Sequence, residues 1–394
     1  MTNSVSRLPT PSDTELAHAA RMHALIADKI IEANGWISFA HYMQLALYEP
    51  GLGYYVSGAQ KFGGGGDFIT APTMSPLYAQ AMAAQVAQIM GQIRSKIEPN
   101  VLEFGAGDGQ LAADLLNALA QLKQLPARYE ILEVSPELQA RQRDTLQRIV
   151  PQWSERVTWR SEWPNAYSGV VLANEVLDAM PASLVVWGER IMERGVGLNS
   201  AGNFCWEDRP ANARMLAEAE AIRAQCKSLD SGFQSEISLA AQDWVRAWGD
   251  ILQEGVLLVV DYGFPRREFY HPLRHGGTLM CHYRHHAHPE PFYLPGLQDV
   301  SVHLDFSALA ISAHDAGLSV YGYTHQARAL FNCGLLDVLS SLPSEGSARL
   351  QANSAVNQWV SPSEMGELFK WIAVGRGVKA PLLAFRQGDK RHTL

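Results

Sequence analysis

Apolar runs of strand length alternate with helix-like segments in the region that follows residue 100. The strand-like runs are residues 101–104, 129–134, 157–159 and 169–173, and the helix-like segments are residues 111–122 and 136–149. Such alternation is typical of parallel strands joined by crossover helices. A later run, residues 256–260, is apolar throughout, as expected for a strand covered on both faces. The sequence therefore predicts an α/β fold with a mostly parallel sheet and helices on both faces.

The first of these strands runs into a turn with three alternate glycines, Val101-Leu-Glu-Phe-Gly-Ala-Gly-Asp-Gly-Gln-Leu111. Glycines at such a turn let a nucleotide-like ligand approach the backbone. The third glycine comes one position earlier than in the dinucleotide pattern G-x-G-x-x-G, and two acids stand where a pyrophosphate would bind. Acids suit the cationic amino and sulfonium groups of S-adenosylmethionine. The cofactor-binding candidates of this turn are Glu103, Gly105, Gly107, Asp108 and Gly109.

Two other interpretations of the turn stay open. One is a site for NAD, which the early third glycine disfavours. The other is a tight connection between strand and helix that binds no ligand.

An acid also ends the second strand of the alternating region. Glu133 stands at the strand tip, where Rossmann-type sites use a carboxylate to accept bonds from two ribose hydroxyls. We assign Glu133 to the ribose of the cofactor; the alternatives are a solvated strand-end acid or a cap for the helix that opens at Pro136. Ser135 is a further cofactor-binding candidate, or the cap of the same helix.

The fourth strand ends in Asn174-Glu-Val-Leu-Asp-Ala-Met-Pro181. Ligands bind at the carboxyl ends of parallel strands, so these polar residues are expected to face the same crevice as the glycine turn. Two acids and an amide beside a transferable methyl group suit a cationic nitrogen acceptor. Asn174 is assigned to the cofactor, and Glu175 and Asp178 to catalysis. In the alternative interpretation, Asp178 caps a turn before Pro181.

Histidines gather in the segment from Cys281 to His288. The run lacks the helical or hairpin spacing of zinc ligands, so a surface or substrate loop is predicted and no metal site. In the short segment Val302-His-Leu-Asp-Phe306, His303 and Asp305 share one face of a strand end. Such a pair is more often structural than catalytic, but His303 is kept as a third catalytic candidate.

The composition of the chain limits which partners and cellular locations are expected. The formal charge of -8 gives no general attraction to nucleic acid. The four cysteines form no C-x-x-C pair and fit a reducing compartment. No apolar run approaches the about 20 residues of a membrane span. Residues 1–13 lack the features of a signal or transit peptide, so a cytoplasmic location without membrane insertion is expected.

The chain is divided by these patterns into four regions. Residues 1–74 form an N-terminal helical part and a glycine-rich lid at residues 61–72, for which a flexible linker is the alternative. Residues 75–184 form the first part of the cofactor-binding core. Residues 185–250 are an insertion or accessory region, and residues 251–394 complete the sheet and its substrate-side loops.

Taken together, these motifs closely resemble those of the MidA-like methyltransferases, a family that includes a mitochondrial protein-arginine methyltransferase assisting assembly of respiratory complex I. The similar segments are residues 50–55, 66–72, 103–109, 133–136, 174–181, 261–263 and 303–306. The resemblance implies a class I methyltransferase fold of Rossmann-like type, S-adenosylmethionine as cofactor and, in the eukaryotic relatives, an arginine of a complex I core subunit as acceptor. Thr73 departs from the family, which often carries an acid there.

We therefore expect methyl transfer to a protein nitrogen, an arginine of a complex I subunit. The rival hypothesis is a non-catalytic assembly factor that binds the cofactor in the same pocket.

Overall fold

The computed structural model of the chain describes residues 8–56, 70–94, 99–227, 229 and 231–394. The chain divides into two compact units, each assembled from three stretches of sequence. The first unit takes in Met1–Phe68, Asp178–Gln242 and Phe264–Asp305, and the second takes in Ile69–Leu177, Asp243–Gly263 and Phe306–Leu394. Residues 61–69 of the segment predicted as a lid lie outside the described residues.

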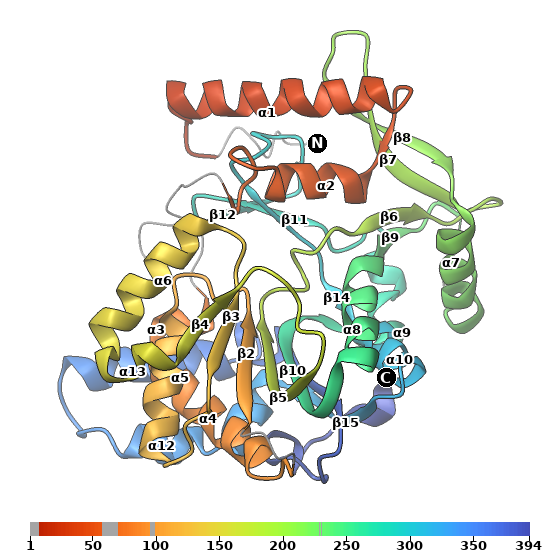
Figure 1. Cartoon of the computed structure of the whole chain (residues 1–394). Coiled ribbons are helices and arrows are strands. Elements are labelled where there is room, and N and C mark those ends of the chain that lie inside the picture. Colours follow the sequence, from red (N-terminus) through yellow and green to blue (C-terminus); the bar gives the residue numbers. More distant parts are fainter. Residues whose placement is uncertain (1–7, 57–69, 95–98, 228, 230) are drawn as a thin grey trace. The chain divides into compact units, whose positions relative to one another are not determined.

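The second unit contains a sheet with the strand order β15-β16-β10-β5-β2-β3-β4 (Figure 1). The run from β10 to β4 is parallel, whereas β16 is antiparallel to both β10 and β15. The bounds are Asn100–Phe104 (β2), Tyr129–Leu132 (β3), Val157–Arg160 (β4), Tyr167–Asn174 (β5), Leu252–Phe264 (β10), Ser319–His325 (β15) and Phe369–Arg376 (β16). The predicted α/β fold with a mostly parallel sheet is confirmed.

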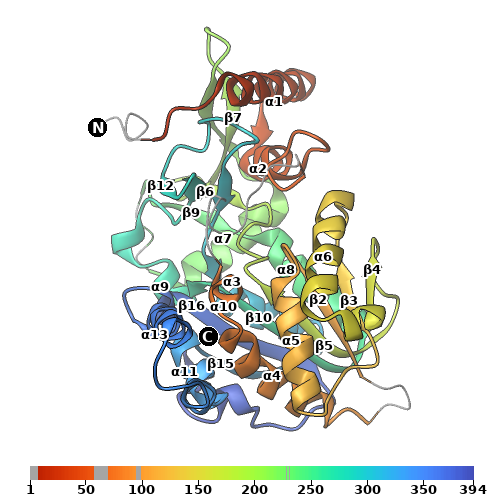
Figure 2. The same cartoon turned by 90° about the vertical axis from the view of Figure 1, so that its left-hand side faces the viewer.

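Side chains of the central strands alternate between two covered faces of this sheet. Val256, Leu258 and Val260 of β10 belong to the same hydrophobic cluster as the buried residues of α4 and α5, which lie over the near face in Figure 2. On the other face, the ring of Phe104 packs against Trp244 and Trp248 of α8, with centroids 5.1 and 6.0 Å apart. Successive side chains point to opposite faces of the sheet, and both faces are covered. The strands are therefore apolar at nearly every position.

The helices around this sheet are mostly short. Their bounds are Ala71–Met74 (α3), Leu77–Met90 (α4), Gln110–Gln121 (α5), Pro136–Ile149 (α6), Leu239–Ile251 (α8), Phe306–Asp315 (α10), Gln326–Asn332 (α11), Leu335–Ser340 (α12), Ser347–Val360 (α13) and Met365–Leu368 (α14). Throughout the part of the chain that the structure describes, no helix combines the length and the apolar character needed to cross a membrane.

Among its described residues, the first unit contains two antiparallel sheets, the short strand β14 and four α-helices that lie wholly within it. One sheet has the order β1-β7-β6-β9 with β8 paired to β7, and a smaller sheet has the order β12-β11-β13. The strands are Ile37–Ser38 (β1), Ser183–Val186 (β6), Met192–Leu198 (β7), Phe204–Pro210 (β8), Gln234–Ile237 (β9), Met280–Tyr283 (β11), His286–His288 (β12), Asp299–Ser301 (β13) and Leu304–Asp305 (β14). The helices are Asp13–Glu32 (α1), Phe39–Tyr48 (α2), Ala213–Gln225 (α7) and Arg266–Phe269 (α9).

The histidine-rich run forms a hairpin, and the prediction of a loop was wrong there. Its strands β11 and β12 pair antiparallel, and the turn between them holds Arg284 and His285 at φ values of 46° and 64°. Cys281 and Tyr283 are buried on one side of β11, and this burial of alternate residues favours a strand. Within the described ranges, no group of three His, Cys, Asp or Glu side chains is placed to hold a metal ion.

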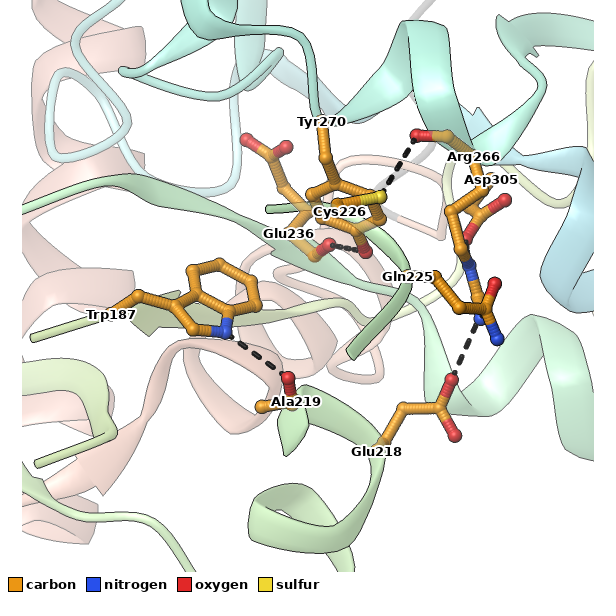
Figure 3. A network of polar contacts seen from close by, with 9 residues as sticks. All are labelled: Trp187, Glu218, Ala219, Gln225, Cys226, Glu236, Arg266, Tyr270 and Asp305. Atoms are coloured by element: carbon orange, nitrogen blue, oxygen red, sulfur yellow. Dashed lines mark hydrogen bonds and ion pairs between the residues drawn. The ribbon is translucent and has the colours of Figure 1, made fainter. Parts of the chain in front are cut away.

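A buried ion pair organises another part of the first unit (Figure 3). Arg266 donates through Nε to Asp305 Oδ2 at 2.7 Å, and both side chains are less than a tenth exposed. The same guanidinium lies 3.4 Å from Glu218 and 3.4 Å from Gln225, two residues of α7. Asp305, the companion of His303 in sequence, is therefore paired with an arginine, and the pair joins α9, α7 and β14.

We expect Arg266→Ala to destabilise the protein by about 3 to 5 kcal/mol, because it leaves the Asp305 carboxylate buried without its cation. Urea unfolding measures the change. Arg246→Ala is the matched control: its pair with Asp243 is more than a third exposed on the arginine side, so a change within about 0.5 kcal/mol is expected. Equal changes in the free energy of unfolding for the two substitutions would show that the buried pair contributes no more to stability than the exposed one.

Candidate functional site

The glycine turn after β2 has a backbone that only glycine adopts readily. Gly105, Gly107 and Gly109 have φ values of 64°, 54° and 86°. A Cβ on Gly105 would lie 2.7 Å from a methyl carbon of Val176, and one on Gly109 would lie 3.1 Å from the Cα of Gln142. The turn itself therefore requires glycine, in addition to any ligand. Asp108 accepts a hydrogen bond from the backbone N–H of Gln110 at 3.1 Å and so supports the start of α5.

Glu103 lies inside the sheet, one residue before the end of β2. Its side chain is 2% exposed, and Oε2 accepts a 2.7 Å hydrogen bond from the hydroxyl of Tyr129. Burial raises the pKa of Glu103 from 4.5 to about 7, the Tyr129 bond opposes this shift, and the charge of Asp108 adds to it. Burial thus disfavours the negative charge that was predicted for Glu103 from the sequence.

Glu133 follows β3, and both of its carboxylate oxygens accept hydrogen bonds. Oε1 accepts from the backbone N–H of Ser135 at 2.8 Å, and Oε2 accepts from Nε2 of Gln142 at 3.3 Å. Burial raises the pKa of this carboxyl, and its hydrogen bonds act in the opposite direction. The hydroxyl of Ser135 accepts from the N–H of Leu138 at 3.3 Å, so Ser135 also caps α6. The backbone N–H of Val134 is a further donor to the carboxylate of Glu133.

Gln142 of α6 connects this acid to the glycine turn, a role that was not predicted from the sequence. The side chain is fully buried, and Nε2 also donates to the carbonyl of Gly107 at 3.0 Å. Its Oε1 accepts a 2.8 Å bond from Nε1 of Trp159 in β4. One feature of the sequence could have indicated this role. Gln142 lies one helical turn before the buried Leu146 and on the same face of α6, where an apolar residue is expected.

Asn174 and Glu175 form a strained end to β5. Asn174 lies 3.0 Å from the hydroxyl of Tyr78 through Oδ1, and its Nδ2 donates to Glu175 at 3.2 Å. Glu175 has a φ of 54°, a left-handed conformation that is uncommon for residues other than glycine. Backbone strain of this kind tends to occur at functional sites, where the surroundings enforce it.

Two bonds from β10 enforce this conformation. The N–H of Glu175 donates to the carbonyl of Val260 at 2.9 Å, and the N–H of Leu177 donates to Oδ2 of Asp261 at 2.9 Å. Asp261 is fully buried, and its other oxygen accepts from the N–H of Tyr262 at 2.9 Å. Asp261 stands in a segment similar to the MidA-like family, and its side chain fixes the turn that carries Glu175, a role that was not predicted from the sequence.

Asp178 and His303 both belong to the first unit. The N–H of Val302 donates to the carbonyl of Asp178 at 3.1 Å, so the two catalytic candidates lie on hydrogen-bonded segments. The N–H of His303 donates to the hydroxyl oxygen of Thr278 at 3.0 Å. Thr278 is in turn bonded to the buried carboxylate of Glu236 through its N–H and its hydroxyl, at 2.8 and 3.1 Å.

The carboxyl ends of three parallel strands meet at one edge of the second unit. Phe104 of β2 is in register with Leu132 of β3 and with Ala173 of β5. The glycine turn, Glu133 and Glu175 therefore follow neighbouring strand ends. A turn whose glycines carry no side chains and a carboxylate held at the next strand end fit an adenosine ligand that presents two ribose hydroxyls. The residues present thus fit S-adenosylmethionine.

Comparison with known proteins identifies the family. Residues 81–324 match the model of a family described as "Putative S-adenosyl-L-methionine-dependent methyltransferase". This match covers more than half of the chain. The chain belongs to this family. The predicted methyltransferase family and its cofactor, S-adenosylmethionine, are confirmed.

Solved structures and curated relatives agree with this assignment. A "likely methyl transferase" from Burkholderia thailandensis, bound to S-adenosyl-homocysteine, is 46% identical with a TM-score of 0.93, over 98% of this chain and 100% of that one. Protein arginine methyltransferase NDUFAF7, mitochondrial, from Danio rerio is 28% identical over 388 residues, 89% of this chain and 85% of the relative. The protein of the same name from Homo sapiens is 26% identical over 381 residues, 87% of this chain and 81% of the relative.

The cytoplasmic location expected from the sequence is contradicted by these names, and we withdraw it. The curated relatives from Danio rerio, Homo sapiens and Caenorhabditis elegans are mitochondrial proteins. The expectation came from the composition of residues 1–13, which says nothing of where relatives of the family work.

We expect Gly107→Val to abolish cofactor binding, because a β-branched side chain is strained at a φ of 54° and projects from the turn. Calorimetric titration with S-adenosyl-homocysteine measures the affinity. Gly202→Val is the matched control: Gly202 has a φ of 78° between β7 and β8, and a Cβ at this position would have no atom within 4 Å. Wild-type affinity in a folded Gly107→Val protein would remove the turn from the site.

Glu103 is expected to make stability depend on pH. Since its folded-state pKa of about 7 exceeds its usual value of 4.5, the stability linked to protonated Glu103 is full below about pH 4.5 and is lost as pH rises through 7. Glu103→Gln keeps an acceptor for Tyr129 and removes this titration. The stability of the variant relative to the wild type should therefore rise between pH 5 and pH 8 in urea unfolding. A difference that is constant over this range would contradict the raised pKa.

Proposed function

We propose that the protein transfers a methyl group to an arginine of another protein, and that this protein is a subunit of respiratory complex I. The names of the curated relatives, protein arginine methyltransferases, support the arginine acceptor. The resemblance to the MidA-like family supports the complex I subunit. The observation that carries the proposal is the strained, acidic end of β5, where Glu175 is fixed in a left-handed conformation by bonds to β10. A positioned carboxylate suits a guanidinium, which offers N–H donors and a fixed positive charge.

The cofactor residues are proposed to hold S-adenosylmethionine, which supplies an electrophilic methyl group when bound. Glu133 would accept bonds from the ribose hydroxyls, and the backbone from Gly105 to Gly109 would line the cofactor, with Glu103, Asp108, Ser135 and Asn174 around it. These residues would bind the cofactor and orient its methyl group. Such positioning is the main source of rate enhancement in a simple group transfer.

The acceptor residues are proposed to orient the guanidinium and to take its proton. Glu175 and Asp178 are three residues apart, so the chain separates their Cα atoms by no more than about 11 Å. The N–C bond forms as the S–C bond breaks, and the nitrogen gives its proton to one of these two carboxylates. His303, whose segment is bonded to that of Asp178, is the reserve candidate for this base.

Two substitutions are expected to separate cofactor binding from methyl transfer. Glu133→Ala should weaken S-adenosyl-homocysteine binding by about ten- to a hundredfold, as expected when a charged hydrogen-bond acceptor is lost. Asp178→Asn keeps the shape but loses the charge, so it should leave that affinity nearly unchanged and reduce transfer of labelled methyl groups to protein. Glu137→Ala, an exposed acid in the first turn of α6, is the control for Glu133→Ala. Full transfer by Asp178→Asn would shift the role to Glu175 or His303.

The acceptor itself is tested by mass spectrometry of complex I subunits from cells with and without this protein. We expect one subunit to lose a methyl-arginine when the protein is absent. An unchanged set of complex I subunits would show that this acceptor is wrong. Tight cofactor binding together with no labelled protein in a lysate containing all complex I subunits would favour the non-catalytic assembly factor.

A further inference from the structure

We propose that Gln142 is a positioning residue that makes Glu133 selective for the two ribose hydroxyls of the cofactor and ties Glu133 to the glycine turn. Its single amide contacts the carboxylate of Glu133, the carbonyl of Gly107 and the indole of Trp159. This inference rests on the proposed ribose role of Glu133, and it does not depend on which acceptor is methylated.

The orientation of the Gln142 amide is fixed by the chemistry of its partners. The indole N–H of Trp159 only donates, so the group 2.8 Å away must be the amide oxygen. The nitrogen then faces the other two partners, the Gly107 carbonyl at 3.0 Å and Glu133 Oε2 at 3.3 Å, which both accept. The two N–H bonds and the oxygen are all used. A flipped amide would place oxygen against two acceptors and nitrogen against a donor.

This fixed amide determines what Glu133 can bind. A carboxylate oxygen accepts about two hydrogen bonds, and the N–H of Ser135 and the amide of Gln142 each occupy one position, on Oε1 and Oε2 respectively. The backbone N–H of Val134 is a third donor to the same carboxylate, and together these bonds set the plane in which its two oxygens lie. Two adjacent acceptors held in one plane match a vicinal diol, so the chemistry selected is the pair of ribose hydroxyls.

The same amide also orients the glycine turn. The carbonyl of Gly107 is directed at Gln142, and in a planar trans peptide the N–H of Asp108 then points to the opposite side. The fully buried position of Gln142 makes these bonds costly to lose, because a buried polar group without a partner carries its full desolvation penalty. The turn and the acid are therefore expected to move together when Gln142 is changed.

The test compares Gln142→Glu with the wild type in calorimetric titrations of S-adenosyl-homocysteine and of its 2′-deoxy analogue. The glutamate has the same shape but presents oxygen to both Gly107 and Glu133. We expect its affinity for S-adenosyl-homocysteine to fall by at least about tenfold, and its preference for the ribose ligand over the deoxy ligand to disappear. Gln139→Glu is the matched control on the same helix, because the Gln139 amide bonds the backbone carbonyl of Glu133 and the guanidinium of Arg143 but not the Glu133 carboxylate, and it should keep the wild-type preference.

A second variant decides the matter if Gln142→Glu does not fold. Trp159→Phe leaves Gln142 in place and removes the donor that fixes its amide, while the smaller ring still packs below Arg143, so a smaller loss of the same preference is expected. Wild-type preference in either folded variant, or an equal loss of affinity for both ligands, would overturn the positioning role. If Glu133→Ala also keeps the preference, the ribose assignment of Glu133 itself is wrong. Neither result depends on arginine methylation, because both titrations use no acceptor.

Discussion

The parallel register of β2 with β3 and β5 is the constraint on which the site depends. It sets Phe104 opposite Leu132 and Ala173, so three chain segments leave the sheet at the same edge. Just beyond these strands lie a glycine turn, an acid held by hydrogen bonds to its carboxylate, and a glutamate in the left-handed conformation. One buried amide, that of Gln142, then joins the first two of these features. We propose the cofactor site at this edge because parallel strands deliver their carboxyl ends together.

Several carboxylates are buried in the two units, and their burial lowers the stability of the fold. Glu103, Glu133 and Asp261 of the second unit, and Glu236 of the first, are all less than a tenth exposed. Desolvation of an acid is unfavourable unless hydrogen bonds replace water, and each of these groups accepts bonds from backbone N–H groups or from a tyrosine hydroxyl. Proteins tend to keep such groups where function requires them, at some expense in stability.

The features that could be predicted from the sequence are those that depend on residues close together in the chain. The glycine turn and the order of strands and helices follow from periodicity and from the φ values that glycine permits. Gln142, Tyr78 and Asp261 were missed because their roles depend on partners that are distant in sequence, such as Trp159, Asn174 and Leu177. The histidine run was misjudged for a similar reason, since strand pairing with residues 299–301 decides its conformation. Two compact units built from interleaved stretches are likewise a tertiary feature.

The central claim is that the strand ends of β2 and β3 bind the cofactor through Glu133 and the glycine turn. A crystal structure of this protein with S-adenosyl-homocysteine tests it most directly. The account predicts both ribose hydroxyls within hydrogen-bond distance of the Glu133 carboxylate, and the ligand in contact with the backbone between Gly105 and Gly109. A ligand bound elsewhere, or bound at this edge with no contact to Glu133, would contradict it.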